Sequence, residues 1–487
     1  MSERQRPSRF EQSDDVVVMK FGGTTVEDAA AIRRVIGIVQ SRLGALPVVV
    51  VSALAKVTDQ LLEAGNAAAN GCLGSALATV RDIYVRHEQI ADSLVEGSAY
   101  SALDRELRGE FRALETLLHD LDESRHFDPR AQDQLLAFGE CFSSQLVKEA
   151  LRQAGINSVH VDSRACIVTD AHHGQASPVW DVTNQRIQDT LGPLLENGLV
   201  PVLGGFIAST CDGVPTTLGR GGSDFSAAIL GAALCASRIE IWTDVDGVMT
   251  TDPKLCSDAH VIRKLSFDEA AELAHFGAKV LHPATLAPAM RENIPVYVLN
   301  SRRPEGAGTE ISARARSGDA VSAITARKNL TAVEIESASR AVDSDLLRKV
   351  YAAFDRHSCS VDVIAASLGR VSLQVSSTAP LPAIAADLRG TASVRWESQK
   401  ALVYLVGDDL RRQFDAAADV LASVGDLNVR VVSQGPSDRT ISFLVAEENV
   451  QEAVQRLHAL LFWSAAPSPD WGGITTAFCQ VGFTPAG

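Results

Sequence analysis

Between residues 16 and 311, short runs of β-branched apolar residues alternate with longer stretches that have helical spacing. Strands that are apolar on both faces and are separated by helices are typical of a parallel sheet with helices on both sides. We therefore predict an α/β fold, a three-layer αβα sandwich with a mainly parallel central sheet. The expected strands are 16–19, 48–51, 159–161, 199–203, 239–242 and 295–298, and the clearest helices are 26–43 and 225–236.

Residues 76–154 interrupt this alternation, because they are rich in Leu, Ala, Glu and Arg at helical spacing and contain few strand patterns. We predict a helical insert there, inside a first domain that spans 16–312. Residues 1–15 are polar and lack the apolar core of a secretory signal, so we expect a disordered leader. The sequence around 301–318 is rich in Gly, Arg and Ser, and we assign 313–329 to a linker.

Two weakly similar segments follow, 330–400 and 401–487. Each has the pattern strand, helix, strand, strand, helix, which is typical of a small ferredoxin-like βαββαβ unit. We predict two such units side by side. The second includes a tail rich in Pro and Gly from 463 onward, in which 474–481 has the pattern of an extra strand.

The charge and cysteine content narrow the classes of partner. A formal net charge of −15 argues against nucleic acid or an anionic membrane surface as the main partner. No apolar run reaches the roughly 18 residues that a membrane span needs. The 8 cysteines form no CxxC pair, which is typical of reduced thiols in a cytoplasmic protein. We expect a cytoplasmic protein without nucleic-acid or membrane partners.

Two glycine-rich motifs precede helices. The first, 20–25 (KFGGTT), directly follows the first strand, and its glycines would let backbone amides approach a phosphate. The alternative is an ordinary glycine turn. The second, 218–224 (LGRGGSD), combines three glycines with Arg220 and Asp224 before an apolar helix. It favours an anion site over a flexible surface loop, since the helix packs at once against the sheet.

Three further motifs carry polar groups. Residues 242–248 (WTDVDGV) and 250–254 (TTDPK) follow a strand, at the end where α/β sheets bind ligands, although a capped turn would have the same composition. Lys279 lies in an apolar stretch, 276–283 (FGAKVLHP), and requires an anionic partner. Glu140 follows Gly139 on the helical insert and is either a ligand for an ammonium group or an exposed helix residue.

In this order and spacing, the motifs resemble those of the aspartate kinases of the amino acid kinase family. That family has KFGGTS, SAxAxxT, a GE pair, GRGGSD, WTDVxG with TTDP, and FGAKVLHP. This chain has KFGGTT at 20–25, SALAKVT at 52–58, GE at 139–140, GRGGSD at 219–224, WTDVDG at 242–247, TTDP at 250–253 and FGAKVLHP at 276–283. The two C-terminal units resemble the tandem ACT domains of the same enzymes.

The resemblance implies a kinase domain at 16–312 that transfers the γ-phosphoryl group of ATP, with Mg²⁺, to the side-chain carboxylate of L-aspartate. Lys20 would stabilise the transferring phosphoryl group and Asp224 would hold Lys20. No protein ligand for the metal is assigned. The residues implied to bind ATP are Lys20, Phe21, Gly22, Gly23, Thr243, Asp244, Met249, Lys254, Lys279 and Val280.

For aspartate, the resemblance implies that Arg220 captures the α-carboxylate and Glu140 the ammonium group. Thr58 and Ser223 would donate hydroxyl groups near the reacting carboxylate. That carboxylate is ionised at neutral pH, so the reaction needs no general base.

The chain departs from the family pattern at three positions. Met249 stands where a Tyr is common, which argues against stacking of an aromatic ring on the nucleotide base at this position. Lys254 replaces an Arg, which keeps the charge but loses the planar guanidinium. Leu368 replaces the acidic residue of the SVDxIxxSE motif in lysine-sensitive members, which weakens a prediction of lysine inhibition. We keep Asp362 and Ser367 as allosteric candidates, with lysine, threonine, another effector or no effector left open.

ACT units bury their sheets against another copy, so we expect a homodimer or larger homo-oligomer with an amino-acid effector at that interface. Two alternatives stay open: a related kinase of glutamate, acetylglutamate, carbamate or a nucleoside monophosphate, and a catalytically silent amino-acid sensor. The expected product, 4-phospho-L-aspartate, starts the biosynthesis of lysine, threonine and methionine.

Overall fold

The computed structural model describes residues 16–276, 283–313, 321–338, 344–367, 369–408, 410, 420–427, 429–434 and 439–462, with backbone only for 283–284, 362–367 and 431–434. The chain divides into two compact units. The N-terminal unit contains the residues up to Met249 together with His260–Ser322. The C-terminal unit contains Thr250–Ala259 together with the residues from Ala323 onward.

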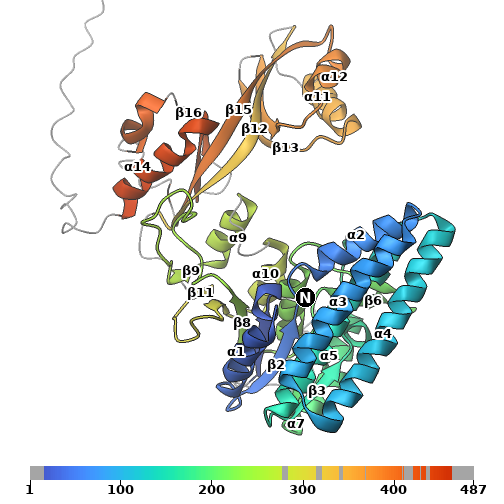
Figure 1. Cartoon of the computed structure of the whole chain (residues 1–487). Helices are drawn as coiled ribbons and strands as arrows, with labels where there is room; N and C mark the ends of the chain where they lie inside the picture. Colours follow the sequence, from blue (N-terminus) through green and yellow to red (C-terminus); the bar gives the residue numbers. More distant parts are fainter. Residues whose placement is uncertain are drawn as a thin grey trace, which may run out of the picture. The chain divides into compact units, whose positions relative to one another are not determined.

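The N-terminal unit is built on an eight-stranded sheet (Figure 1). Six neighbouring strands pair in parallel, in the spatial order β3, β5, β2, β1, β8 and β10. Strand β11 is antiparallel to β10 and parallel to β9. The prediction of a mainly parallel central sheet is therefore confirmed. In spatial order the strands are β3 (Ser158–Val161), β5 (Val200–Gly204), β2 (Leu46–Val51), β1 (Val16–Phe21), β8 (Arg238–Thr243), β10 (Val296–Asn300), β11 (Thr309–Ile311) and β9 (Lys264–Leu265).

Helices cover both faces of this sheet, as predicted for three layers. On one face, α1 (Ala29–Gln40) and α5 (Pro129–Gln153) join a core with the alternate side chains of β1, β2 and β5. On the other face lie α7 (Trp180–Glu196), α8 (Gly222–Ala233) and α10 (Pro283–Arg291), which pack in sequence against one another. The valines of β1 are fully buried because both faces of the strand are covered.

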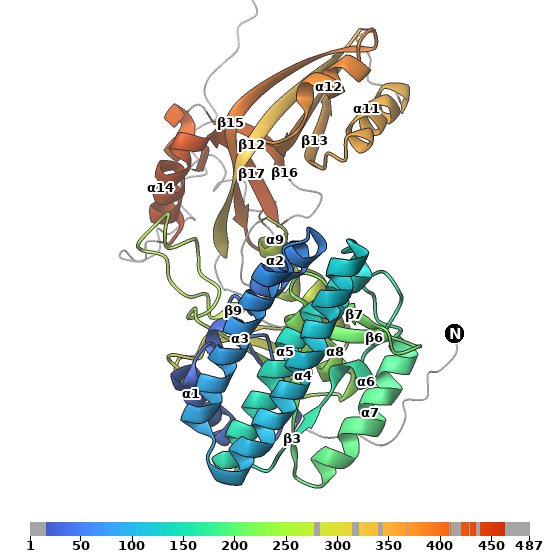
Figure 2. The same ribbon diagram turned by 45° about the vertical axis from the view of Figure 1, so that its right-hand side comes forward.

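Four long helices form a bundle beside the sheet, seen in blue to green in Figures 1 and 2. They are α2 (Val57–Ala69), α3 (Leu73–Leu94), α4 (Gly97–Ser124) and α5. The helical region therefore begins at Val57, before the predicted start at residue 76, because α2 packs against α3, α4 and α5. Phe111 and Phe142 stack at 4.0 Å between ring centroids and tie α4 to α5.

Smaller elements complete the N-terminal unit. A three-stranded sheet contains β4 (Val168–Thr169), β6 (Ile207–Thr210) and β7 (Pro215–Thr217), and β7 leads directly into the glycine-rich loop before α8. The remaining helices are α6 (Ser163–Cys166) and α9 (Phe267–His275). Within the described segments, no helix combines the length and apolarity required to cross a membrane.

The C-terminal unit is a six-stranded antiparallel sheet with helices, so the prediction of ACT-like units is confirmed at the level of fold. Its strands are, in spatial order, β13 (Val361–Ser367), β14 (Arg370–Ser376), β12 (Ala323–Ser337), β15 (Ala392–Val406), β17 (Thr440–Ala446) and β16 (Arg430–Gln434). In Figures 1 and 2, α11 (Ser344–Arg356) and α12 (Leu381–Asp387) lie near one end of the β12–β15 ribbon, and α14 (Val450–Phe462) near the other.

Two long strands, β12 and β15, run through both halves of this sheet. Residues 323–327 of β12 pair with 402–406 of β15, and residues 330–337 pair with 392–400. Asn329 and Gln399, both with positive φ, mark the irregularity between the two parts. The second half thus uses a strand that precedes the first half in the chain, and β12 begins inside the predicted linker 313–329. The predicted strand 474–481 lies outside the described residues, as do residues 414–419, the first half of the helix expected in the second unit at 414–425.

Candidate active site

The carboxyl ends of β5, β2, β1 and β8 lie together at one edge of the central sheet, because these neighbouring strands are parallel. The ends of these strands and the segments that follow them contain the predicted residues Lys20, Phe21, Gly22, Gly23, Thr58, Thr243, Asp244 and Met249. Ligands of open α/β sheets bind at this edge.

The turn after β1 holds Gly22 and Gly23 against two neighbouring segments. The amide of Gly22 donates to the carbonyl of Trp242 at 3.1 Å. A Cβ atom on Gly23 would lie 2.8 Å from the carbonyl oxygen of Ala53, so a larger residue would push the two loops apart. The hydroxyl of Thr25 donates to the carbonyl of Gly22 at 2.6 Å and closes the turn.

Lys20 and Asp224 form an ion pair. Their Nζ and Oδ1 atoms are 2.6 Å apart, and each side chain is 13% exposed. The contact is a close ion pair rather than an aligned hydrogen bond. A Cβ atom on Gly22 would lie 3.7 Å from Nζ, so the ammonium group is beside the glycine turn. The pair therefore joins the end of β1 to the first turn of α8.

The loop before α8 requires glycine at three positions. Gly219 and Gly221 have φ of 75° and 69°, which glycine adopts without strain. A Cβ atom on Gly222 would lie 2.5 Å from the ring of Phe206. Arg220, between these glycines, is exposed, and its guanidinium has no hydrogen bond or ion pair to the described residues. It is available to bind an anion.

Two segments with hydroxyl groups meet beside this loop. The Ser52 hydroxyl, after β2, donates to the Ser223 hydroxyl at 3.0 Å. Thr58 lies in the first turn of α2 and is half-buried. The N-cap of the same helix, Lys56, has a φ of 73°, which is uncommon for a residue with a side chain.

Glu140 on α5 is the deeply buried carboxylate of the site, at 3% exposed. Its Oε1 atom accepts a hydrogen bond from the amide of Ala53 at 3.1 Å. Its Oε2 atom is buried without a partner among the described residues. Burial raises the pKa of Glu140 to about 8, although the Ala53 amide and the charge of Lys20 oppose this shift. Such a group can accept a cation that enters the site.

The predicted nucleotide residues lie on and after β8, next to β1. The rings of Phe21 and Trp242 stack at 6.3 Å. Thr243 ends β8, and its hydroxyl donates to Asp244 at 3.3 Å. Met249 pairs with Val261 in an isolated bridge.

For three other predicted nucleotide residues, the role in binding stays a prediction. Lys254 belongs to the ten-residue segment Thr250–Ala259, which is part of the C-terminal unit. Lys279 and Val280 lie outside the described residues. Groups of three or more His, Cys, Asp or Glu side chains that could hold a metal ion are absent from the described part of the chain.

Comparison with known proteins places this geometry in a family. A model of the amino acid kinase family matches residues 15–300, and a model of the ACT domain matches residues 403–461. The lysine-sensitive aspartokinase 3 of Escherichia coli (strain K12) is 35% identical over 458 residues, which cover 92% of this chain and 99% of that protein. The chain belongs to the aspartokinases. The resemblance inferred from the sequence is thereby confirmed.

Other aspartokinases agree with this assignment. Chloroplastic aspartokinase 3 of Arabidopsis thaliana is 33% identical, covering 91% of this chain and 81% of that protein. A crystal structure of E. coli aspartokinase III in complex with aspartate and ADP, called the R-state, matches with a TM-score of 0.78 and 34% identity, covering 92% of this chain and all of that one. A T-state complex of the same enzyme with lysine and aspartate matches equally well, with a TM-score of 0.78 at 35% identity, covering 92% of this chain and 99% of that one.

Phe206 is a residue of this aspartokinase site that sequence reasoning missed. It has a φ of 66°, a strained value for a bulky residue, and its amide donates to the hydroxyl of Ser226 at 2.9 Å. The two glycines before it approach other site residues: a Cβ atom on Gly204 would lie 2.9 Å from that of Glu140, and one on Gly205 would lie 2.6 Å from that of Ser223. The pair of glycines directly after a buried strand was the available signal.

The two allosteric candidates of this aspartokinase, Asp362 and Ser367, lie on β13 of the C-terminal unit. The structure describes only the backbone of that strand, so the prediction for their side chains lies outside the described atoms.

Proposed function

We propose that this aspartokinase transfers the γ-phosphoryl group of ATP to the side-chain carboxylate of L-aspartate and forms 4-phospho-L-aspartate. The observation that carries the proposal is the Lys20–Asp224 ion pair, which brings the glycine turn after β1 to the loop that presents Arg220. A phosphate-binding turn and an anion-binding arginine are the two groups that a carboxylate kinase must bring together.

Lys20 supplies positive charge to the phosphoryl group, and Asp224 sets the position of Lys20. Phosphoryl transfer depends on alignment and on neutralising the charge of the transferred group. Two unit charges about 4 Å apart interact by about 4 kcal/mol at an effective dielectric near 20. Mg²⁺ enters with ATP as part of the substrate. The glycines at 22 and 23 let the phosphate approach the backbone, where the amide of Gly23 donates to a phosphate oxygen, while the amide of Gly22 holds the turn to the Trp242 carbonyl.

Glu140 and Arg220 hold the two charged groups on the α-carbon of aspartate. The Oε2 atom of Glu140, which has no hydrogen-bond partner among the described residues, accepts the ammonium group. The Arg220 guanidinium, also without a partner there, binds the α-carboxylate with two hydrogen bonds. Thr58 and Ser223 then face the β-carboxylate. This carboxylate attacks as an anion, so no side chain needs to remove a proton.

The nucleotide is held on the β8 side of the site by Phe21, Thr243, Asp244 and Met249. Lys254, Lys279 and Val280 complete this set as family expectations. Support comes from the E. coli relative, whose crystal structure contains aspartate and ADP.

A substrate panel tests this function. The full-length protein is mixed with MgATP and, separately, with L-aspartate, L-glutamate, N-acetyl-L-glutamate, carbamate or UMP, and ADP release is measured. Hydroxylamine traps an acyl phosphate as a hydroxamate. We expect ADP release and hydroxamate with L-aspartate. Activity on glutamate but not on aspartate would reassign the substrate, and nucleotide binding without turnover would indicate a silent sensor.

An amino-acid effector binds the C-terminal unit, at an interface between two copies of the chain. The ACT match and the lysine complex of the E. coli relative support such control. Assays with lysine, threonine and methionine, alone and in pairs, identify the effector, and light scattering measures the oligomeric state. Asp362, Ser367 and the cytoplasmic location stay predictions.

A further inference from the structure

Asp133, on α5, is a buried carboxylate that accepts hydrogen bonds from two separate segments. Only 1% of it is exposed. It accepts from Nδ1 of His173 at 2.7 Å and from the amide of Gly174 at 3.0 and 3.1 Å. It also accepts a short hydrogen bond from the hydroxyl of Thr217. A buried carboxylate requires such donors, and here they come from the loop 170–177 and from the end of β7.

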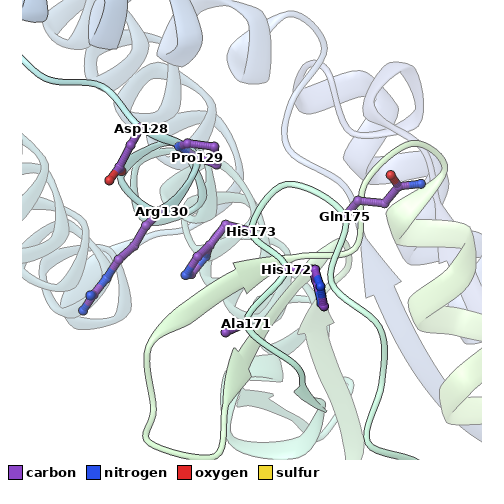
Figure 3. Close-up of a pocket in the computed structure, with 7 residues that line it drawn as sticks. All are labelled: Asp128, Pro129, Arg130, Ala171, His172, His173 and Gln175. Carbon is purple, nitrogen blue, oxygen red and sulfur yellow. The ribbon is translucent and has the colours of Figure 1, made fainter. Parts of the chain in front are cut away.

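The loop 170–177 has little packing on its outer side. Figure 3 shows this loop beside the first turn of α5, where a cavity of about 560 Å³ opens between Arg130, His172 and His173. The side chain of His172 is 83% exposed. Because the outer face is open, the position of the loop depends on its inward bonds, which are those to Asp133 and the bond from the amide of Ala176 to the carbonyl of Thr217.

The loop 170–177 in turn supports the segment that carries Arg220. The amide of Ala176 donates to the carbonyl of Thr217 at 2.9 Å. A Cβ atom on Gly219 would lie 3.2 Å from the carbonyl oxygen of Gly174 and 3.4 Å from the side chain of Gln175. Gly219 directly precedes Arg220, so the backbone that presents the guanidinium rests on a loop that Asp133 holds.

Asp133 and Glu140 project from the same face of α5, since they are separated by about two helical turns. One helix, α5, therefore carries both carboxylates, Asp133 and Glu140. Glu140 faces the place proposed for the ammonium group, and Asp133 fixes the position, relative to α5, of the turn that presents Arg220.

We propose that Asp133 is a positioning residue for aspartate binding, which sets the distance between Arg220 and Glu140 through Thr217, His173 and Gly174. This inference rests on the proposed function. Asp133 does not touch the substrate, and it acts on the affinity for the α-carboxylate rather than on phosphoryl transfer.

The Asp133→Asn variant tests the proposal, because an amide of the same shape has one acceptor oxygen and no charge. We expect the KM for aspartate to rise about ten- to a hundred-fold, with the KM for ATP and kcat at saturating aspartate within about two-fold of the wild type. The matched control is Asp128→Asn. Asp128 caps the same helix by accepting from the amide of Ala131 at 2.8 Å, and an asparagine keeps this cap, so the control removes a carboxylate charge from the start of α5 without releasing Thr217 or Gly174.

A double-mutant cycle separates positioning from general stability. If Asp133 acts through Arg220, Asp133→Asn raises the aspartate KM in the wild-type background but adds less than about two-fold in Arg220→Ala. Full additivity of the two effects would overturn the proposal, as would an unchanged aspartate KM or an equal rise in both KM values for Asp133→Asn.

A second pair of variants serves if Asp133→Asn does not fold. Thr217→Val removes the hydroxyl that donates to Asp133, and Thr217→Ser keeps it. We expect a raised aspartate KM for the valine variant and recovery in the serine variant; equal KM values in both would overturn the proposal. A wild type without aspartate-dependent ADP release would remove the proposed function itself, whereas an active wild type with an unaffected Asp133→Asn variant removes this inference alone.

Discussion

The ammonium group of Lys20 lies 2.6 Å from a carboxylate oxygen of Asp224, although Lys20 is near the end of β1 and Asp224 is in the first turn of α8. The contact holds the Gly22–Gly23 turn, proposed to bind phosphate, next to the loop that carries Arg220. It also makes the two residues separable by experiment, since one carries the charge that faces the phosphoryl group and the other holds it.

Lys20→Ala is expected to lower kcat by about a hundred- to a thousand-fold, because it removes a preorganised charge from the transition state. Asp224→Asn should lower kcat less, since Lys20 keeps its charge and loses its position. Steady-state ADP release measures both, and circular dichroism checks the fold. Lys264→Ala, at an exposed position of β9, is the charge control. Near-wild-type turnover of Lys20→Ala would contradict the assigned role.

Aspartate binding is expected to release close to one proton at pH 7. Burial raises the pKa of Glu140 to about 8, so the free enzyme holds this carboxyl mostly protonated at pH 7. An ammonium group beside it favours the carboxylate and lowers its pKa, so the proton leaves on binding. Calorimetric titration of aspartate in buffers of different ionisation enthalpy measures the release.

The matched variant for this titration is Glu140→Gln, which cannot ionise. It should bind aspartate more weakly and release no proton at pH 7. The aspartate affinity of the wild type should rise between pH 7 and 8.5, and that of the variant should stay flat. Equal proton release by both proteins would show that Glu140 does not pair with the ammonium group.

His87, in α3 of the helical bundle, is expected to destabilise the fold at acid pH. Burial lowers its pKa from 6.5 to about 4. As the pH falls below 6.5, the unfolded chain gains a proton that the folded chain does not accept until about pH 4, so the free energy of unfolding decreases through this window. A shift of this size corresponds to about 3 kcal/mol.

The His87→Leu variant should remove this acid-dependent loss. Nε2 of His87 is buried without a hydrogen-bond partner in the described residues, and Nδ1 bonds only to the Ile83 carbonyl of the same helix at 2.7 Å, so we expect a cost of about 1 kcal/mol at pH 7. Urea unfolding at several pH values from 4 to 7 compares the variant with the wild type. His126→Leu, at an exposed histidine, is the control. If the free energy of unfolding decreases equally with falling pH in His87→Leu and in the wild type, another group causes the acid sensitivity.

His458→Ala is expected to raise the KM for ATP several-fold. Nε2 of His458, on α14, lies 2.9 Å from the hydroxyl of Thr250, and both groups are buried. Thr250 follows Met249 directly, and its carbonyl accepts from the amide of Ile324 at 2.7 Å. Loss of a buried hydrogen bond costs about 1 kcal/mol and should loosen the chain next to the nucleotide residues.

The control for His458→Ala is Gln451→Ala, at an exposed position of the same helix. ATP titrations at saturating aspartate measure both variants, and thermal melting checks their fold. A folded His458→Ala protein with the wild-type KM for ATP would show that Thr250–Ala259 does not affect nucleotide binding.

Local patterns were sufficient to predict the layered α/β fold. The valine runs of β1 and β2 are apolar at every position, and only a strand covered on both faces buries such a run. Glycine requirements were also visible, since Gly219 and Gly221 adopt φ values that other residues resist. These features depend on neighbours in the chain.

Features that depend on contacts between distant residues could not be predicted from the sequence. Residues 323–327 were assigned to a linker, because nothing local indicates that they pair with 402–406. Nothing local indicates that residues 250–259, which include Lys254, belong to the C-terminal unit through contacts with α14 and β12, and the nucleotide role of Lys254 stays a prediction. The close approach of Phe206, which has a positive φ, to Gly222 at the start of α8 was likewise not visible in the sequence.

The order of strands, helices and glycine turns could thus be predicted from the sequence, because the periodicity of hydrophobic residues and the backbone freedom of glycine act over a few residues. The burial of Glu140 and the donors gathered around Asp133 were decided only by the folded chain. Desolvation and hydrogen bonding of a carboxylate depend on groups that the chain brings from far along its length.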